Sequence, residues 1–286
     1  MADFEAAPSK AGLSPAQKEH YRREGYVAPV AGLSPEEAAA VRSRMAETEQ
    51  RNGGALKGAM RHKPHLLFPW AAELIRHPKV LDAVEDVLGP NLLCWSSTFF
   101  IKEANDPSFV SWHQDLTYWG LSAPDIVTAW IALSDSSVDN GAMRVIPGTH
   151  TTEQLPHRDT FDPKNLLTRG QEIAVEVDEN EAVALVLQPG EFSLHDVKLV
   201  HGSEPNPSSR RRIGYAVRYI PTYVYQTAGE RDSATLVRGV DREGHFEPEP
   251  MPLSDMHPDA VAFHQATTER QAGVLMRGTG KQGFRA

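Results

Sequence analysis

A histidine and an aspartate separated by one residue, His113 and Asp115, are the first side chains in this sequence whose types and spacing could do chemistry. The stretch around them alternates like a β-strand, and alternate side chains of a strand share one face. His113 and Asp115 would then point to the same side, and Gln114 would point to the other. An imidazole and a carboxylate side by side offer one nitrogen and one oxygen to a metal ion.

A second histidine would complete a metal site, and His201 is the strongest candidate. It follows a hydrophobic run in the sequence Leu-Val-His-Gly-Ser, far along the chain from Asp115. Two imidazoles and one carboxylate form the facial set that binds non-haem Fe(II) and leaves coordination positions open. A lone His-x-Asp in a chain with 12 histidines would more often be a surface or hydrogen-bonded pair, so the prediction depends on the combination.

An arginine shortly beyond His201 could hold an anion beside such a metal. The segment from Arg212 to Arg218 alternates like a strand, so that Arg212, Gly214, Ala216 and Arg218 share one face. Two small residues between two arginines leave room for a ligand. A guanidinium there could bind a carboxylate through two parallel hydrogen bonds.

Three motifs, in this order, resemble the phytanoyl-CoA dioxygenase family of Fe(II)- and 2-oxoglutarate-dependent oxygenases. They are Trp-His-Gln-Asp-Leu from residue 112, Asn-Gly-Ala-Met-Arg-Val-Ile-Pro-Gly-Thr-His from residue 140, and His-Gly-Ser from residue 201 with Arg212 after it. The resemblance spans residues 15–220. It is specific for the family and nearly silent on the substrate.

The resemblance implies that His113, Asp115 and His201 bind Fe(II), with 2-oxoglutarate and O2 as co-substrates that yield succinate and carbon dioxide. The cofactors carry this chemistry, and the protein orients and shields it. Halogenases that resemble this family have a small residue in place of the carboxylate. Asp115 therefore favours hydroxylation, or another oxidation that starts from C–H cleavage.

The resemblance also assigns residues to the co-substrate. Arg212 would bind the distal carboxylate of 2-oxoglutarate, and Ser203 would donate a hydroxyl beside it. Trp130 resembles a tryptophan that lines the co-substrate pocket, although a plain core tryptophan is an equal alternative.

Four side chains near the motifs could contact a substrate. Tyr118 and Trp119 could stack on it or form a cation–π wall, and core packing is the competing interpretation. Arg144 and Arg218 could pair with a carboxylate, phosphonate or phosphate, and salt bridges within the fold are the alternative. By analogy alone, the substrate would be a small metabolite or a natural-product intermediate.

Other histidines are expected to lie outside the metal site. His195 would lie on the same face of a straight strand as His201, but six residues would separate them by about 20 Å, too far to share one ion. If the strand bends, His195 would lie beside the ligands without binding the metal, or at the surface. His62 and His65 lie in a loop rich in Gly, Lys, His and Pro, without a carboxylate at ligand spacing. Lys57 in the same loop could help to hold an anion, but an exposed loop lysine is the simpler interpretation.

The sequence predicts a single domain over residues 1–286, mainly β with flanking helices. Ser-Pro pairs at residues 14–15 and 34–35 predict helix starts in a helical flank over 1–90, and residues 1–12 are expected to be a loose tail. Many short strands over 91–220 predict a jelly roll, for which the resemblance implies a double-stranded β-helix, a cupin-like barrel. Residues 221–286 form an extension, with a helix near 259–273, that we expect to act as a lid.

Composition excludes several function classes. The net charge is −9, with 29 basic and 38 acidic residues and no basic stripe, which argues against a nucleic-acid partner. The single cysteine, Cys94, excludes a disulfide framework and suits a reducing cytoplasm. No signal-peptide pattern or run of 18 apolar residues predicts export or a membrane span. The oligomeric state is left open.

Two other functions remain compatible with the residues. Two imidazoles and a carboxylate also suit zinc or manganese in a cupin-type hydrolase or isomerase, although the position of Arg212 would then have no purpose. A non-catalytic metal-binding barrel would bind metal without turnover. Succinate formation that requires Fe(II), 2-oxoglutarate and oxygen distinguishes the oxygenase from both.

Overall fold

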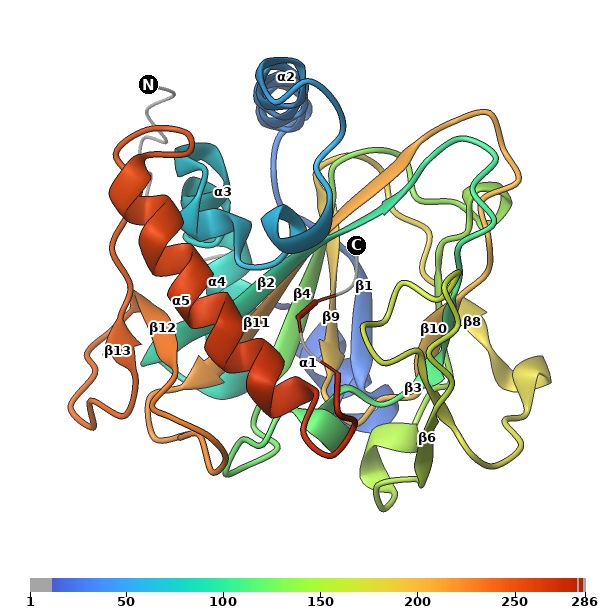
Figure 1. Cartoon of the computed structure of the whole chain (residues 1–286). Helices are drawn as coiled ribbons and strands as arrows, with labels where there is room; N and C mark the ends of the chain where they lie inside the picture. The colour runs from blue at the N-terminus through green and yellow to red at the C-terminus, as the bar shows by residue number, and fades with distance from the viewer. Residues whose placement is uncertain (1–11, 282, 285–286) are drawn as a thin grey trace.

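Two β-sheets packed face to face form the body of the protein, whose computed structural model describes residues 12–281 and 283–284 (Figure 1). The major sheet has the strand order β1-β9-β4-β11-β2-β12-β13, and the minor sheet has the order β3-β10-β5-β8. The bounds in the major sheet are β1 Tyr26–Ala31, β2 Leu92–Lys102, β4 Val127–Ala132, β9 Glu191–Asp196, β11 Arg212–Pro221, β12 Ser233–Arg238 and β13 Glu247–Pro248. Those in the minor sheet are β3 Val110–His113, β5 Met143–Val145, β8 Val183–Ala184 and β10 His201–Ser203.

This arrangement confirms the predicted fold class, a jelly roll of the double-stranded β-helix type with helices outside. A short third sheet pairs β6 His157–Asp159 with β7 Gln171–Ile173. The segments 173–177 and 182–187 are rich in valine, which favours strands, but only Ile173 of the first and Val183–Ala184 of the second lie in strands, β7 and β8. Their valines Val175, Val183 and Val186 are exposed, so they lack the packing that would extend the ladders.

The predicted helix starts are confirmed. Ser14 and Ser34 each form a capping box, in which the serine hydroxyl accepts from a backbone N–H and a Gln or Glu side chain accepts from the serine N–H. The helices are α1 Pro15–Glu24, α2 Pro35–Arg51, α3 Pro69–Leu74, α4 Pro78–Leu88 and α5 Pro258–Leu275. The tail predicted over 1–12 lies almost wholly outside the described residues.

Strand β11 shows how the two sheets divide their side chains. Ile213, Tyr215 and Val217 pack into the large core cluster with residues of α1 to α4, which cover the outer face of the major sheet. Arg212 and Ala216 face inward and line a cavity. The predicted alternation along β11 is therefore confirmed. Both faces of the strand are buried, because it lies between the helical layer and the second sheet.

Two of the connections between the sheets position residues of the candidate site. The chain leaves β9 in the major sheet, turns at residues 197–200 and enters β10 in the minor sheet. The dipeptide Asn140-Gly141, which is typical of tight hairpin turns, lies in another such connection. Gly141 has a φ of 76° after a 3-10 turn, Val138–Asn140, but the flanking strands β4 and β5 belong to different sheets, so the turn does not close a hairpin.

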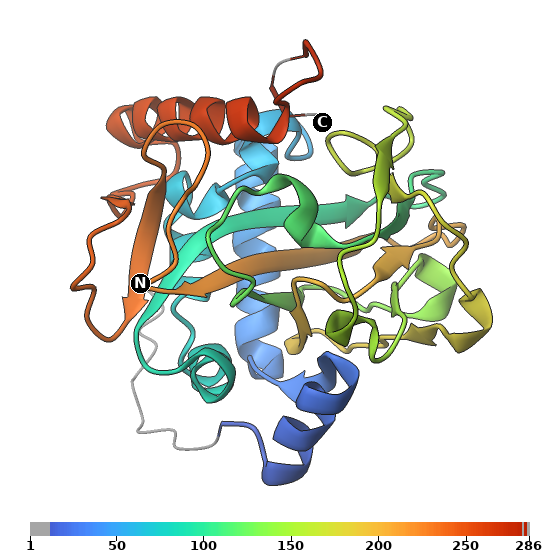
Figure 2. The ribbon, with the colours of Figure 1, turned by 90° about the horizontal axis from the view of Figure 1, so that it is seen from below.

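The C-terminal extension is integrated with the barrel rather than appended to it. β12 pairs with β2, so the major sheet continues past residue 220, where the sequence analysis placed the end of the core. Helix α5 crosses in front of the major sheet in Figure 1. Figure 2 shows α5 and α1 at opposite ends of the view with strands of the major sheet between them.

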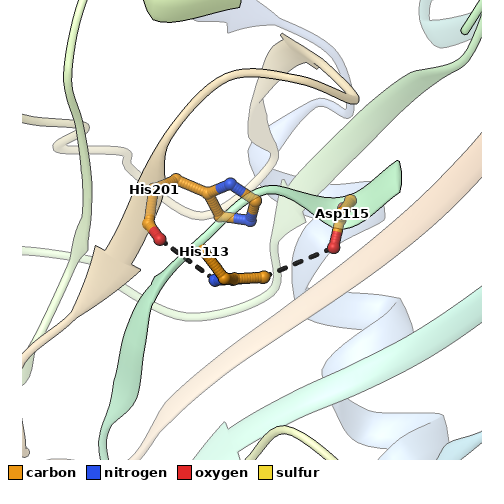
Figure 3. A group of neighbouring side chains, drawn as sticks. All are labelled: His113, Asp115 and His201. Carbon is orange, nitrogen blue, oxygen red and sulfur yellow. Dashed lines mark hydrogen bonds and ion pairs between the residues drawn. The ribbon is translucent and has the colours of Figure 1, made fainter. Parts of the chain in front are cut away.

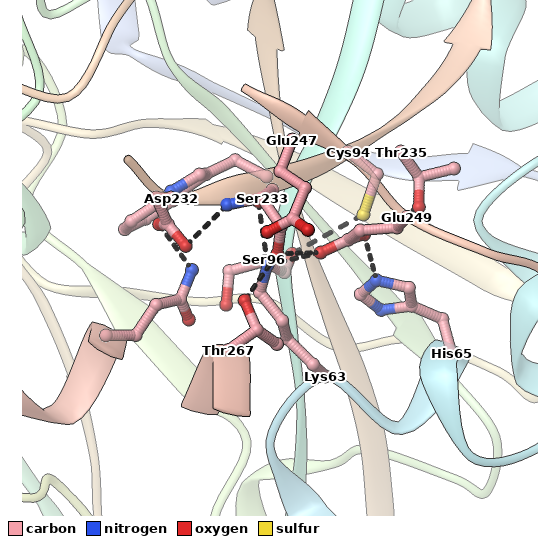
Figure 4. A network of polar contacts seen from close by, with 12 residues as sticks. Lys63, His65, Cys94, Ser96, Asp232, Ser233, Thr235, Glu247, Glu249 and Thr267 are labelled. Carbon is pink, nitrogen blue, oxygen red and sulfur yellow. Dashed lines mark hydrogen bonds and ion pairs between the residues drawn. The ribbon is translucent and has the colours of Figure 1, made fainter. Parts of the chain in front are cut away.

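A buried polar network ties this extension to the loop before α3 (Figure 4). The Lys63 ammonium lies 2.5 Å from one oxygen of Glu249, and the His65 imidazole lies 2.9 Å from the other. Ser233 and Thr235 of β12 donate to the same carboxylate at 2.8 and 2.6 Å. His65, predicted not to be a metal ligand, serves this network.

Cys94 is buried and free. Within the described part of the chain, no helix is long and apolar enough to cross a membrane.

Candidate active site

The three predicted metal ligands converge. His113 ends β3, Asp115 begins the 3-10 turn Asp115–Tyr118, and His201 begins β10 directly opposite His113 in the ladder. One ligand atom from each side chain lies within 4.8 Å of the others, and all three residues are buried (Figure 3). Asp115 is not in a strand as predicted, but Gln114 points away, since its amide donates to the carbonyl of Lys198 at 2.7 Å.

Backbone carbonyls fix which nitrogen each imidazole offers to a metal. Nδ1 of His113 lies 2.9 Å from the Ser111 carbonyl and 3.0 Å from that of His201, and Nδ1 of His201 lies 2.9 Å from the Leu199 carbonyl. A ring nitrogen facing a carbonyl oxygen must carry the proton, so Nε2 of each ring is left with its lone pair. This is the usual arrangement of metal-binding histidines.

Electrostatics favour the metal-binding protonation states of Asp115 and His201. Burial alone would raise the pKa of Asp115, but the imidazoles of His113 and His201 beside it hold that pKa well below its usual range. Burial lowers the pKa of His201, and His113 lowers it further. An ionised carboxylate beside neutral imidazoles is the set that Fe(II) requires.

A cavity beside the three ligands contains the residues predicted to bind the co-substrate. Arg212, Ser203 and Trp130 all line it, and the Arg212 guanidinium lies 5.3 Å from the centre of the Trp130 ring. Gly214 lies on β11 two residues after Arg212 and packs against the Trp130 ring. A Cβ at this position would collide with that ring, so only glycine fits. The predicted small residue therefore seats the tryptophan against the strand.

The polar atoms of this cavity fit a dicarboxylate. Arg212 Nε, Thr128 Oγ1 and His195 Nδ1 are buried without a hydrogen-bond partner among the described residues. Buried polar groups are almost always paired, so unpaired ones that line a cavity indicate a polar ligand. The carboxylate and keto oxygens of 2-oxoglutarate could accept hydrogen bonds from these unpaired groups.

The prediction that His195 lies far from the metal site is wrong. Its ring centroid is 4.8 Å from that of His201, and it lines the same cavity. The two residues are not on one straight strand, because the turn at 197–200 carries the chain from the major to the minor sheet. Facing sheets then bring the two rings together.

A second cavity, of about 100 Å³, adjoins the first and contains Tyr118 and Trp119. Asp115, Phe100 and Arg218 line both cavities. The walls also include Gln271, Val274 and Leu275 of α5, and Phe284, which follows the helix in the chain. The structure thus brings three of the four predicted substrate residues to a cavity that opens on the metal ligands.

Arg144 is not brought there. It lies on β5, 3.2 Å from Glu179 and 3.5 Å from Glu204, with its guanidinium over the Trp112 ring. This is the salt-bridge alternative, and the surface where it occurs is separate from both cavities. A substrate role for Arg144 has no support in the structure.

Comparison with known proteins accounts for this geometry. The model of the family described as phytanoyl-CoA dioxygenase matches residues 21–214, which is more than half of the chain. The chain belongs to the phytanoyl-CoA dioxygenase family. Fe(II) and 2-oxoglutarate are the metal and the co-substrate of this family, and the residues described above fit both.

Individual relatives agree in sequence and in structure. A probable alpha-ketoglutarate-dependent hypophosphite dioxygenase from Stutzerimonas stutzeri is 33% identical over 59% of this chain and 60% of its own length. Human peroxisomal phytanoyl-CoA dioxygenase is 33% identical over 47% and 42%. The chain therefore spans about three fifths or less of the length of these curated relatives.

Among solved structures, an apo non-heme monooxygenase, ThoJ, superposes with a TM-score of 0.80 at 37% identity, covering 91% of this chain and 97% of its own. CytC3 with Fe(II) and alpha-ketoglutarate gives 0.61 at 28% identity, covering 84% and 98%. The family fold thus extends over nearly the whole chain.

The structure shows residues that the sequence analysis missed. Trp95 and Gln271 line the second cavity, and the buried Asp232 accepts from both, at 2.7 Å from Trp95 Nε1 and 2.9 Å from Gln271 Nε2. Thr128 could have been predicted from the sequence, because it lies two residues before Trp130 on one strand and therefore on the same face. No sequence pattern indicates Asp232, since its partners lie far away in sequence.

Replacing Arg212 with alanine is expected to raise the 2-oxoglutarate concentration needed for half-maximal turnover by roughly ten- to a hundredfold, because charge-assisted hydrogen bonds are lost. Metal affinity should stay near normal, since Arg212 contacts none of the three ligands in the described structure. Succinate formation and metal titration measure the two effects. Arg144→Ala, which removes the same charge outside the cavities, is the control, and an unchanged 2-oxoglutarate requirement in Arg212→Ala would contradict the assignment.

Proposed function

We propose that this protein is an Fe(II)- and 2-oxoglutarate-dependent dioxygenase that hydroxylates, or otherwise oxidises by C–H abstraction, a small organic anion. The substrate would be a metabolite or natural-product intermediate with an apolar body and one carboxylate, phosphonate or phosphate group. His113, Asp115 and His201 would hold the metal, and Arg212, Ser203 and Trp130 would hold the co-substrate.

Arg218 is the observation that carries the substrate class. Its guanidinium lies 5.7 Å from the ring centre of Phe100 and 5.6 Å from that of Trp119, and it lines both cavities. Its Nε is buried without a partner, and no described carboxylate forms an ion pair with it. A buried guanidinium without an ion-pair partner, placed between aromatic rings, suits a ligand anion.

The rest of the second cavity suits an apolar body with polar substituents. Indole, phenyl and aliphatic side chains form much of the wall, and the amides of Gln171, Gln226 and Gln271 interrupt it. Apolar walls with a few directed polar groups are typical of small-molecule sites. The hypophosphite dioxygenase among the relatives, by its name, acts on a small oxyanion, which supports an anionic substrate here.

The chain's own residues then divide the work. The bound metal, with oxygen and 2-oxoglutarate, supplies the oxidising chemistry. Arg212 and Ser203 orient the co-substrate, and Arg218 anchors the acidic group of the substrate near Asp115. Trp119 and the α5 side chains exclude water from the reacting centre, which limits side reactions.

The alternatives fit less well. A zinc or manganese hydrolase or isomerase would use the three ligands but would leave the Arg212 cavity without a purpose. A non-catalytic barrel would not need two adjoining cavities with unpaired buried guanidinium nitrogens. Both would release no succinate.

The deciding experiment is anaerobic loading of the full chain with Fe(II) and 2-oxoglutarate, followed by exposure to oxygen with a panel of small organic acids and their neutral amides. Succinate release coupled to oxidation of an acid supports the proposal. Turnover of substrates without oxygen favours a hydrolase or isomerase, and preference for the amides contradicts an anionic substrate.

Arg218→Met is expected to lower kcat/KM for the acidic substrate by roughly ten- to a hundredfold, because one charge-assisted contact is lost. The slow release of succinate without substrate should persist, since the metal and co-substrate sites remain. Arg144→Met is the matched control. Equal loss of substrate-dependent and substrate-independent succinate release would place Arg218 in the co-substrate site instead.

We further propose that the C-terminal extension acts as a lid, because α5 supplies part of the cavity wall. Removing residues 240–286 would also remove Glu249 from the buried network, so limited proteolysis is the better test. Substrate should protect α5 from cleavage. Cleavage at the same rate with and without substrate would contradict a lid.

A further inference from the structure

Two buried cations beside the co-substrate cavity have no carboxylate partner among the described residues. Lys102 ends β2 and Arg212 begins β11, and the two residues are directly opposite in the antiparallel ladder, so their side chains share a face. Their exposed fractions are 0% and 2%. By contrast, the equally buried Lys63 lies 2.5 Å from Glu249.

Ser203 links Lys102 to the cavity. Lys102 Nζ lies 2.7 Å from Ser203 Oγ and also donates to the backbone carbonyl of Glu204. Ser203 lines the cavity together with Arg212, whereas Lys102 lies behind it. Lys102 can therefore act on a bound ligand through the serine hydroxyl and through its charge.

The two cations differ in how they can relieve the cost of burial. A guanidinium keeps its proton in proteins, whereas a buried lysine readily loses one. Burial lowers the pKa of Lys102 to about 6, with Arg212 acting in the same direction and Asp106 and Glu204 in the opposite one. Without a bound anion, Lys102 is therefore mostly neutral above this pH.

We propose that Lys102 is a positioning residue that couples the binding of 2-oxoglutarate to the uptake of one proton. The inference rests on the proposed function. The distal carboxylate, once placed against Arg212 and Ser203, supplies the missing negative charge and favours the ammonium form of Lys102. The proton comes from solvent, and the only bond formed is N–H.

Protonation also reorients the serine. A neutral amine can accept a hydrogen bond from the Ser203 hydroxyl, but an ammonium can only donate to its oxygen. The O–H of Ser203 is then free to donate to the carboxylate. Lys102 thereby turns the hydroxyl toward the co-substrate at the moment when the co-substrate arrives.

Calorimetry tests the coupling without turnover. 2-Oxoglutarate is titrated anaerobically into the Fe(II)-loaded full chain at about pH 8 in buffers of different ionisation enthalpy, which gives the number of protons taken up. We expect close to one proton per 2-oxoglutarate, and an affinity that falls about tenfold per pH unit between about pH 7 and 9. The sign follows because binding takes up a proton.

Variants assign the proton to the residue. Lys102→Met should abolish the uptake, make the affinity nearly independent of pH and weaken it by roughly ten- to a hundredfold at about pH 6. Ser203→Ala should weaken binding but retain the uptake. Lys79→Met, at an exposed position on α4, should behave like the wild type. Metal affinity should be the same in all four proteins.

Each outcome bears on a separate claim. Binding by the wild type without proton uptake, or uptake that persists in Lys102→Met, overturns this inference and leaves the oxygenase proposal standing. Failure of the wild type to bind 2-oxoglutarate overturns the proposed function and this inference with it. The wild-type proton count requires no variant, so the test holds even if Lys102→Met does not fold.

Discussion

Replacing Asp115 with alanine is expected to abolish turnover and leave the fold intact. The side chain supplies one of three ligand atoms, and a metal centre contributes several kcal/mol to transition-state stabilisation, so we expect a loss of about a thousandfold or more. The backbone N–H of Asp115 donates to the carbonyl of Val197 at 3.0 Å, and alanine keeps this bond. The turn that carries residue 115 should therefore form as before.

Succinate formation measures the loss, an Fe(II) titration measures the weakened metal site, and circular dichroism checks the fold. Asp139→Ala removes an exposed carboxylate from another 3-10 turn and serves as the control, with activity expected to be unchanged. Wild-type turnover in Asp115→Ala would remove Asp115 from the metal site. Loss of the circular dichroism signal of the folded protein would indicate that Asp115 is required for folding instead.

Local periodicity was sufficient to predict the orientation of the site residues. His113 and Asp115 flank a residue that points the other way, and Arg212, Gly214 and Ala216 alternate with core residues along β11. In both cases the information lies within a few neighbouring positions, because side chains alternate along extended backbone. His201 was chosen from its place after a hydrophobic run and before an arginine, and the family resemblance supported the choice, since strand pairing over such a distance leaves no local pattern.

His195 shows where this kind of reasoning fails. Parity and a straight strand placed it far from His201, whereas the chain crosses between sheets at residues 197–200. No feature of the intervening Val-Lys-Leu-Val segment marks such a turn, because it lacks the glycine or proline that usually does. Proximity across two facing sheets is a tertiary property.

Charged residues were the hardest to place. Arg144 and Arg218 have the same type and both lie on strands near motifs, yet one pairs with glutamates at the surface and the other is buried in two cavities. No sequence pattern links Lys63 with Glu249. Their pairing depends on how the C-terminal extension packs, which no short-range pattern encodes.

Lys63 and Glu249 give the second large expected effect, which is on stability. Both side chains are fully buried, and the carboxylate also receives hydrogen bonds from Ser233 and Thr235. Removing one member of a buried ion pair leaves an uncompensated charge. Lys63→Met is therefore expected to lower the free energy of unfolding by about 3–5 kcal/mol, as measured by urea denaturation.

Acid should weaken the same network. Burial alone would raise the pKa of Glu249, but Lys63 and His65 hold it well below its usual range, and burial lowers the pKa of His65. A depressed carboxyl pKa gives stability above the unfolded value, near pH 4.3, that is lost as pH falls; a depressed imidazole pKa begins to cost stability below about pH 6.5. Both contributions make the wild type less stable on acidification.

A double variant separates charge from packing. Lys63→Met with Glu249→Gln removes both charges and keeps the shape of the network, so it should be more stable than the sum of the single changes predicts, by roughly 0.5–3 kcal/mol. Arg210→Met breaks an exposed pair with Asp139 and should cost less than about 1 kcal/mol. If Lys63→Met were no more destabilising than Arg210→Met, the buried pair would not anchor the extension, and the wall that α5 contributes to the cavity would have to be held by its apolar contacts alone.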